Sequence, residues 1–200
     1  MSSITYDFIQ SSYAKYGYKF YDQGKYNINL FGIRPKNPLV NEFGCILGVA
    51  YLDEFLIKQC LTFRGSTLPG LYYLKNKLGN VNGTFILAPG QHVKCWKAGY
   101  HHIGKPNQYE AYQQAGPGVF KGYRDNDKDG QLDMTGTLYT DVAGLNGHTT
   151  KETDTDIVGA YSAGCQVVRD DKEHAIWLNV GKRSAELYGN LFTYTLFQRQ

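Results

Sequence analysis

Pairs of turn-forming residues recur between short apolar runs, and this spacing constrains the fold more than any other feature of the chain. The pairs include Pro69-Gly70, Asn82-Gly83, Pro89-Gly90, Asp129-Gly130 and Asn146-Gly147. Glycine supplies the positive φ and proline the fixed φ that tight turns need. Together with 23 Gly and 17 Tyr, the pattern is typical of an all-β or β-dominated fold.

The apolar runs between these turns indicate strands. We expect strands within 27–34, 45–52, 55–63, 71–74, 83–89 and 192–197. A short N-terminal helix is expected over 4–15, with Ser3 as a candidate cap. A second helix should begin at the capping box of Asp170 and Glu173 and run to Gly181. The sequence therefore predicts a mainly β sandwich or sheet with one or two short helices.

The length of 200 residues is enough for one domain with a substantial core and too little for two well-developed ones. We expect residues 1–25 to form an N-terminal helical and aromatic extension and residues 26–200 to form the main domain. The net charge of +3 is spread along the chain, without the basic stripe of a nucleic-acid binder. No nucleic-acid partner is expected.

The N-terminal sequence lacks a basic region followed by a continuous apolar run. No stretch approaches the roughly 20 apolar residues of a membrane span. We therefore expect a soluble protein without a signal peptide. Cys45, Cys60, Cys95 and Cys165 show no metal-binding spacing, and four cysteines in 200 residues do not make a disulfide scaffold. At least one cysteine is thus expected to be available as a nucleophile.

The segment 144–168 places a histidine after a glycine-rich strand end and a cysteine in a turn of small residues. A cysteine attacks as its thiolate, and a nearby imidazole lowers the thiol pKa and carries protons. We predict Cys165 as the nucleophile and His148 as its base, with the backbone amides of Gly164 and Cys165 stabilising an oxyanion. The plainer interpretation is a buried structural cysteine and a loop histidine.

His148-Thr149, followed after residues 150–161 by Ser162-Ala163-Gly164-Cys165, resembles the active-site pattern of the L,D-transpeptidase family. In that family a His-Gly or His-Ser segment precedes Ser/Thr-His-Gly-Cys. A second family feature, a Thr-Pro-x-Gly-x-Tyr/Phe strand entry, is echoed by residues 66–72, which end at Tyr72. The resemblance spans about residues 27–197 and implies an L,D-transpeptidase-like β fold.

The resemblance also implies roles for single residues. Cys165 would be the nucleophile, His148 its base, Thr149 the residue that orients the imidazole, and the turn from Ser162 to Cys165 the oxyanion hole. The family's second histidine, directly before the Gly-Cys pair, is Ala163 here, so a donor on the substrate side is missing.

The implied reaction is attack on a peptidoglycan stem peptide to give an acyl-enzyme, which water resolves to cleavage and an amine to a cross-link. No cofactor is needed for this chemistry. Because no export signal is evident, we expect cleavage at the cell wall or periplasm by an enzyme delivered in phage lysis or carried in a virion. The alternatives are a catalytically weak wall-binding or virion structural module, favoured by Ala163, and a cysteine peptidase of protein substrates.

Two histidines and one tyrosine are further candidates for the substrate cleft. His101 or His102 would line the cleft or replace the donor lost at Ala163, and Tyr72 belongs to the strand-entry motif. Adjacent residues on a strand point to opposite faces, so at most one of the two histidines is expected to face a given site. Exposed loop histidines are the alternative.

An acidic segment matches the start of a calcium-binding loop. Asp125, Asp127, Asp129 and Asp133 would supply oxygen ligands, with glycine at the sharp turn between them. Position twelve of the loop is Gly136 where a bidentate glutamate is usual. The segment therefore predicts either a calcium site or a plain acidic hairpin tip.

Overall fold

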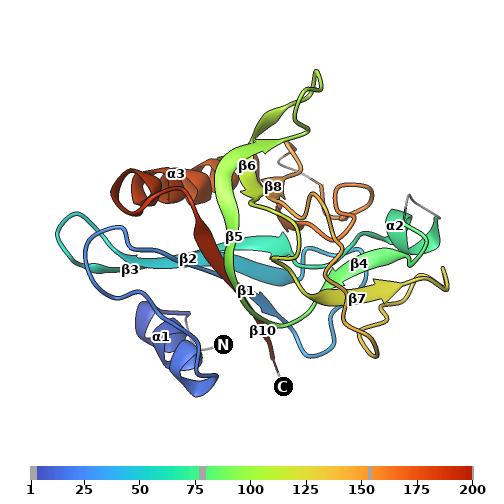
Figure 1. Cartoon of the computed structure of the whole chain (residues 1–200), viewed down its shortest axis with the longest axis horizontal. Coiled ribbons are helices and arrows are strands. Elements are labelled where there is room, and N and C mark those ends of the chain that lie inside the picture. Colours follow the sequence, from blue (N-terminus) through green and yellow to red (C-terminus); the bar gives the residue numbers. More distant parts are fainter. Residues whose placement is uncertain (1–3, 77–79, 153–154, 200) are drawn as a thin grey trace.

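The barrel is the main architectural feature of the chain. The structure, a computed structural model, describes residues 4–76, 80–152 and 155–199. Eight of its strands form a closed barrel in the order β1-β10-β5-β6-β8-β9-β3-β2, and β4 and β7 form a separate two-stranded sheet (Figure 1). The mainly β class is confirmed, and the large sheet closes on itself as a barrel.

The bounds of the elements follow the chain. The barrel strands are β1 (Asn29–Arg34), β2 (Cys45–Leu52), β3 (Lys58–Ser66), β5 (Gly90–His101), β6 (Tyr109–Gln114), β8 (Gly147–Thr149), β9 (Gln166–Val168) and β10 (Phe192–Gln198). The small sheet contains β4 (Thr84–Leu87) and β7 (Gly122–Asp125), and the helices are α1 (Tyr6–Lys15), α2 (Leu71–Lys75) and α3 (Asp171–Tyr188).

One predicted strand is wrong. Residues 71–74 form the helical turn α2 because the Pro69-Gly70 pair starts a helix rather than a hairpin. The carbonyl of Gly70 accepts a hydrogen bond from the amide of Tyr73 at 3.0 Å. This turn buries Leu74 and leaves Tyr72 exposed.

The barrel closes through short ladders around β8 and β9. β6 pairs with β8 through Tyr112 and Gly147, and β3 pairs with β9 only near Ser66. By contrast, β2 and β3 pair along the whole length of β2. β8 and β9 run parallel to each other, as do β1 and β10. The segment predicted to carry the active site therefore lies where the barrel strands are joined by the fewest paired residues.

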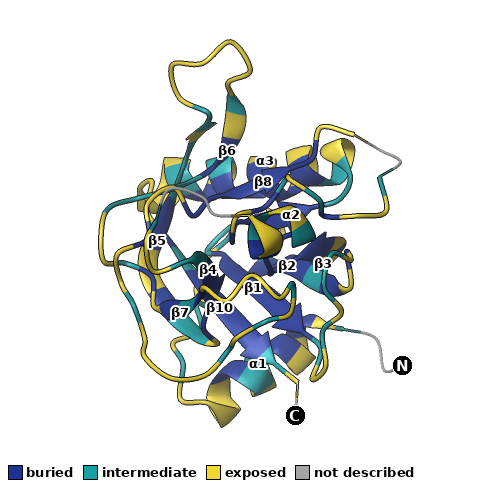
Figure 2. Cartoon of the chain, turned by 90° about the vertical axis from the view of Figure 1, so that its right-hand side faces the viewer, coloured by how far each residue is buried: buried dark blue, intermediate teal, exposed yellow. Residues whose placement is uncertain are grey.

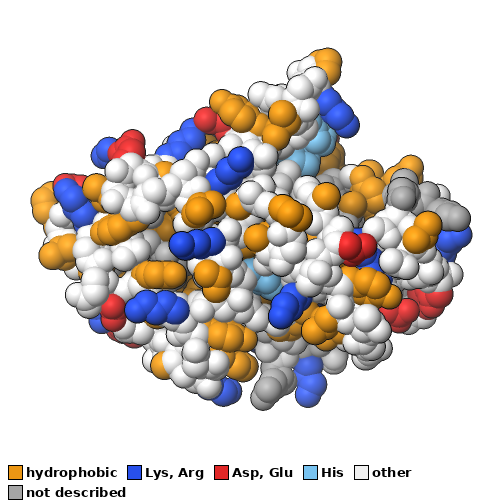
Figure 3. All heavy atoms as spheres, viewed as in Figure 1, with side chains coloured by type: hydrophobic (Ala, Val, Ile, Leu, Met, Phe, Trp, Pro, Cys, Tyr) orange, Lys and Arg blue, Asp and Glu red, His pale blue; other side chains and the backbone are white. Residues whose placement is uncertain are grey.

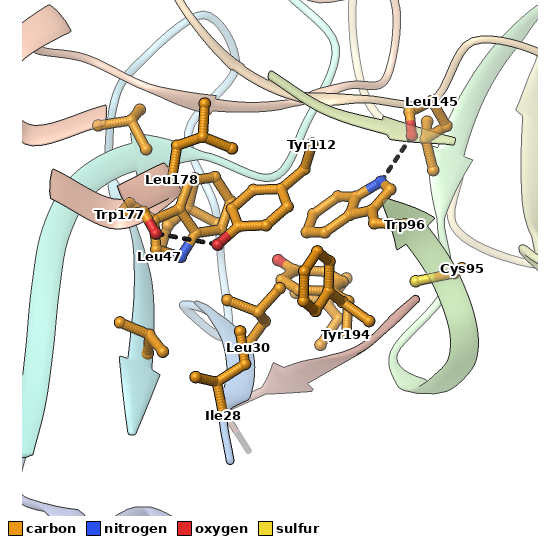
Figure 4. Packing of buried hydrophobic residues seen from close by; sticks show 14 of the residues in the cluster. Ile28, Leu30, Leu47, Cys95, Trp96, Tyr112, Leu145, Trp177, Leu178 and Tyr194 are labelled. Atoms are coloured by element: carbon orange, nitrogen blue, oxygen red, sulfur yellow. Dashed lines mark hydrogen bonds between the residues drawn. The ribbon is translucent and has the colours of Figure 1, made fainter. Parts of the chain in front are cut away.

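The core of the barrel contains four large aromatic side chains, those of Trp96, Tyr112, Trp177 and Tyr194 (Figure 4). Trp96 is fully buried, stacks on Tyr112 at a centroid distance of 5.6 Å, and packs against Tyr194 at 4.4 Å with the ring planes tilted by 37°. The indole Nε1 of Trp96 donates to the Leu145 carbonyl at 2.8 Å, and the Tyr112 hydroxyl donates to the Trp177 carbonyl at 2.9 Å. Each buried aromatic polar atom named here thus has a partner.

Helix α3 covers one side of this core and starts as expected. The Asp170 carboxylate accepts hydrogen bonds from the amides of Lys172 and Glu173. The predicted end at Gly181 is wrong, because the helix continues to Tyr188. Gly181 serves close packing instead, since a Cβ there would lie 2.2 Å from the hydroxyl of Tyr112.

Helix α1 packs on the outside of the barrel. Its buried face, Tyr6, Ile9 and Tyr13, lies against Phe31 of β1 and Phe197 of β10. Thr5 is the N-cap, and the candidate cap Ser3 lies outside the described residues. β1 and β10 are buried along nearly their whole length, whereas the tip of the β5–β6 hairpin is exposed (Figure 2). No helix within the described ranges combines the length and apolarity that a membrane crossing requires.

Candidate active site

The parallel pair β8–β9 brings the two predicted catalytic side chains to one face of the sheet. His148 pairs with Val167, and the amide of Gln166 donates to the Asn146 carbonyl at 2.9 Å, which extends the ladder toward Cys165. Paired residues in parallel strands share a face, and side chains alternate along each strand. Cys165, two residues before Val167, is therefore a diagonal neighbour of His148 on the same face.

The thiol of Cys165 is buried and protonated at rest. Its residue is 8% exposed and packs against Phe43, Val158 and Val167. Its Sγ accepts from the Asn146 amide and donates to the Gly144 carbonyl, each at 3.4 Å. Burial raises the pKa of the thiol to about 11, against the lowering that was expected, and no hydrogen bond joins it to His148 in the described residues.

The imidazole of His148 is fixed as one tautomer. Its Nδ1 lies 2.8 Å from the Thr149 carbonyl and 3.0 Å from the Tyr109 hydroxyl, which itself donates to that carbonyl at 2.8 Å. A carbonyl only accepts, so Nδ1 carries the proton and Nε2 carries the lone pair. Burial, and then the neighbouring His101, lower the pKa of His148 well below its usual value. The result is a neutral imidazole with a buried Nε2 that has no hydrogen-bond partner in the part of the chain that the structure describes.

Thr149 orients the imidazole through its backbone, as just described, and its hydroxyl has another role. The Thr149 hydroxyl accepts from the Lys151 amide at 3.2 Å. Tyr109, at the start of β6, is the second orienting group and was missed from the sequence. Nothing in the sequence around Tyr109 marks it, because its place beside His148 depends on the pairing of β5 with β6 and β6 with β8.

His101, at the end of β5, stacks on His148. The ring centroids are 4.1 Å apart and the planes differ by 11°. The His101 Nδ1 lies 2.9 Å from the side-chain amide nitrogen of Asn146. Asn146 therefore touches both His101 and, through its backbone amide, the thiol of Cys165. The sequence marked Asn146 only as a turn residue.

A pocket of about 570 Å³ opens beside these residues and includes His101, Gly144 and Asn146 in its wall. Histidine atoms reach the surface below the projecting β5–β6 hairpin (Figure 3). His102 also lines the pocket, so the expectation that at most one of the two histidines faces a given site is wrong. The φ of 55° at His102 ends the extended conformation and with it the alternation of side chains.

The turn before Cys165 is held by Ser162. The Ser162 hydroxyl accepts from the Gly164 amide at 3.1 Å and donates to the Cys165 carbonyl at 2.9 Å. Gly164 has φ +122°, and a Cβ there would lie 2.4 Å from the Phe85 carbonyl, so the position requires glycine. The Gly164 amide is thus engaged inside the turn rather than directed at a substrate. Ala163 is exposed.

Two other predicted groups lie apart from this cluster. Tyr72, on α2, is 49% exposed, packs edge-on against Tyr73 and does not line the pocket beside Cys165. The acidic segment follows β7. Among the described residues, no three His, Cys, Asp or Glu side chains are placed to hold a metal ion.

The carboxylates of the acidic segment bind backbone amides of the same segment. Asp127 accepts from the Asp129 amide at 3.0 Å, and Asp125 accepts from the Asp133 amide at 3.2 Å. The second oxygen of Asp125 is buried and finds no partner among the residues that the structure describes. Burial, together with the charges of Asp133, Asp127 and Asp129, raises the pKa of Asp125. Calcium binding stays a prediction.

No family model matches the chain, and neither a curated protein nor a solved structure does so. The likeness to L,D-transpeptidases therefore depends on residues 66–72 and 144–168 of the sequence. What the cluster around Cys165 does has to follow from its own geometry and chemistry.

Proposed function

We propose that this protein is a cysteine-nucleophile acyl-transfer enzyme of the L,D-transpeptidase type that acts on peptidoglycan stem peptides. One observation carries the proposal. His148 is a buried neutral imidazole whose Nδ1–H is fixed by the Thr149 carbonyl and whose Nε2 has no partner among the described residues, on the face that also holds Cys165. An unpartnered buried nitrogen costs stability, so a catalytic use is the best physical reason for it.

The reaction follows from these two groups. The thiol sulfur of Cys165 attacks the substrate carbonyl carbon while its proton passes to Nε2 of His148. The C–N bond then breaks, and the leaving amine takes the proton from His148, which leaves a thioester on Cys165. Water attacks this thioester, gives one proton to His148 and releases the carboxylic acid, after which the sulfur recovers its proton.

The substrate class is supported by the sequence motifs around Tyr72 and Cys165 and by the neighbouring pocket. A volume of about 570 Å³ is suited to a short peptide segment. We favour cleavage over cross-linking because water can take the acceptor role without a second peptide. In the cell we place this activity at the bacterial wall, with delivery by a phage or in a virion.

The test uses purified peptidoglycan sacculi. The wild-type protein is expected to release soluble fragments that mass spectrometry identifies as cut within stem peptides, and Cys165→Ala is expected to release none. Cys60→Ala is the matched control, because Cys60 is the partly exposed cysteine on β3 and should leave the products unchanged. Wild-type protein that gives no Cys165-dependent product would contradict the proposal.

A second candidate is a wall-binding module that keeps the fold without turnover. The observation that favours it is the raised pKa of the Cys165 thiol, which donates to the Gly144 carbonyl rather than to His148. In this case the wild type and Cys165→Ala would sediment equally with sacculi and neither would release fragments. Selective labelling of Cys165 by iodoacetamide near neutral pH would instead favour the enzyme.

A further inference from the structure

One of the two backbone amides predicted to stabilise the oxyanion is already engaged in a hydrogen bond within the fold. Backbone amides before a nucleophile stabilise an oxyanion only when they point at the substrate. Here the Gly164 amide donates to the Ser162 hydroxyl, and the Asn146 amide points at the thiol sulfur. Of the two predicted donors, only the Cys165 amide is left, so a second donor has to come from elsewhere, and the pocket wall is the place to look for it.

The side-chain amide of Asn146 determines which nitrogen of His101 carries a proton. Its oxygen accepts from the Gln114 amide at 2.9 Å, so its NH₂ group faces the other way. That NH₂ group lies 2.9 Å from the Nδ1 of His101. Because NH₂ only donates, Nδ1 must accept, and the proton of neutral His101 is on Nε2.

His101 stays neutral across the physiological range. Burial, followed by the nearby charges of His102 and Lys105, lowers its pKa to about 4. A neutral imidazole that donates from nitrogen polarises a carbonyl without bringing a charge into the site. Within the described residues, the His101 Nε2 has no hydrogen-bond partner and is not among the buried polar atoms. It is therefore open to the pocket that His101 lines.

We infer that His101 donates its Nε2–H to the substrate carbonyl oxygen that becomes negative when Cys165 attacks. The inference rests on the proposed function and adds a catalytic residue from a third strand, β5. Bonds change as already described at Cys165 and His148. The contribution of His101 is a hydrogen bond that strengthens as the C=O becomes C–O⁻ and weakens when the carbonyl forms again. No proton is transferred to or from His101.

The stack on His148 gives a way to separate this role from a structural one. His101→Phe keeps a flat ring against His148 and removes the donor, whereas His101→Gln places an amide NH₂ close to the position of Nε2. Asn107→Ala is the control, because Asn107 lies in the exposed loop of the same hairpin. The assay uses as its substrate a soluble stem-peptide fragment that was released from sacculi beforehand. A soluble substrate allows kcat and KM to be measured separately.

We expect His101→Phe to lower kcat about 100-fold to 1,000-fold with KM within about 3-fold of wild type, as for the loss of one oxyanion donor. His101→Gln should recover at least about a tenth of wild-type kcat, and Asn107→Ala should match wild type. A His101→Phe enzyme with wild-type kcat, or with raised KM alone, overturns the inference, and so does a His101→Gln enzyme as slow as His101→Phe.

A measurement on the unmodified protein covers the case in which a variant does not fold. Nitrogen-15 NMR distinguishes the two imidazole tautomers, and we expect His101 to carry its proton on Nε2 and His148 on Nδ1 at pH 7. A proton on Nδ1 of His101 would overturn the inference whether or not the protein is an enzyme. Failure of the proposed function would look different, as wild-type protein without Cys165-dependent products.

Discussion

The aromatic core and the histidine cluster lie next to each other and differ in how their polar atoms are satisfied. In the core, the indole of Trp96 and the hydroxyls of Tyr112 and Tyr194 each donate to a named acceptor at 2.8 to 2.9 Å. In the cluster, the Nε2 of His148 and the Nδ1 of His102 are buried and have no partners within residues 4–76, 80–152 and 155–199.

This difference separates residues that stabilise the fold from residues that cost stability. A buried polar atom without a partner costs about 1–3 kcal/mol, and a folded chain keeps few of them. The core gains both packing and hydrogen bonds from its aromatic side chains. The cluster has hydrogen bonds as well, at His148 Nδ1 and at Asn146, but its unpartnered nitrogens oppose stability, as expected if its residues have the proposed catalytic role.

Trp96→Ala tests the aromatic core and has the largest expected effect. The free energy of unfolding should fall by about 3–5 kcal/mol, because a large buried ring is lost and the Leu145 carbonyl loses its donor. Urea denaturation measures the change. Val93→Ala, at an exposed position of the same strand, should stay within about 0.5 kcal/mol of wild type. A loss below about 1 kcal/mol for Trp96→Ala would contradict the comparison.

His148→Phe tests the histidine cluster, the other region of this comparison. We expect kcat/KM on stem peptides to fall at least about 100-fold, since the general base is lost. The free energy of unfolding should change by less than about 1 kcal/mol, because Tyr109 still donates to the Thr149 carbonyl and one unpartnered nitrogen disappears. Activity assays and urea denaturation of the same preparation decide the point. A large loss of stability would make His148 a structural residue.

Acid should destabilise the protein through its buried histidines. Burial lowers the pKa of His92 and His174 to about 4 and that of His148 well below its usual value. The unfolded chain, with histidine pKa values near 6.5, then binds more protons, so stability is lost as pH falls below about 6.5 toward 4.

At pH 5.5 the loss should be about 1 kcal/mol for each of these three histidines, with a smaller share from the more exposed His101. Tm should therefore fall by about 6–12 °C between pH 7.5 and pH 5.5. Thermal melts over this range measure it. A flat Tm would mean that the histidines titrate normally and are not held neutral.

The acidic segment has the smallest expected effect. If the four carboxylates of this segment, including that of Asp125, converge on calcium, 5 mM calcium should raise Tm by about 2–5 °C. Asp125→Asn should remove this shift, because it lacks a charged ligand at the first loop position. The same variant should be slightly more stable than wild type without calcium, since the raised pKa of Asp125 means that its buried charge is unfavourable. Equal Tm values with and without calcium would contradict a calcium site and favour the plain acidic hairpin tip.

The sequence predicted local features well and long-range features poorly. β2 coincides with the run from Cys45 to Leu52, and the cap of α3 at Asp170 was visible as a capping box. There are exceptions: α2 shows that an aromatic run after Pro69-Gly70 is ambiguous over so few residues, and the strands β5, β6 and β7 were not predicted. Closure into a barrel depends on pairings between distant strands, which no local pattern encodes.

The candidate site divides in the same way. His148 and Cys165 lie close in the chain, and their residue types and spacing, together with the resemblance to the L,D-transpeptidase pattern, predicted a shared site. Asn146, Tyr109 and the tautomer of His101 depend on contacts that form only after β5, β6 and β8 have come together. The sequence thus indicated the two residues proposed to react, and the fold adds the groups that contact them.

The short ladders around β8 and β9 have a consequence for when the thiol reacts. Strands joined by few backbone bonds separate at a lower free energy than the barrel unfolds, so this pair should open locally while the aromatic core stays intact. Cys165 is sealed and protonated in the closed state. The reaction of this thiol with any reagent from solution should therefore depend on how often this part of the barrel wall opens.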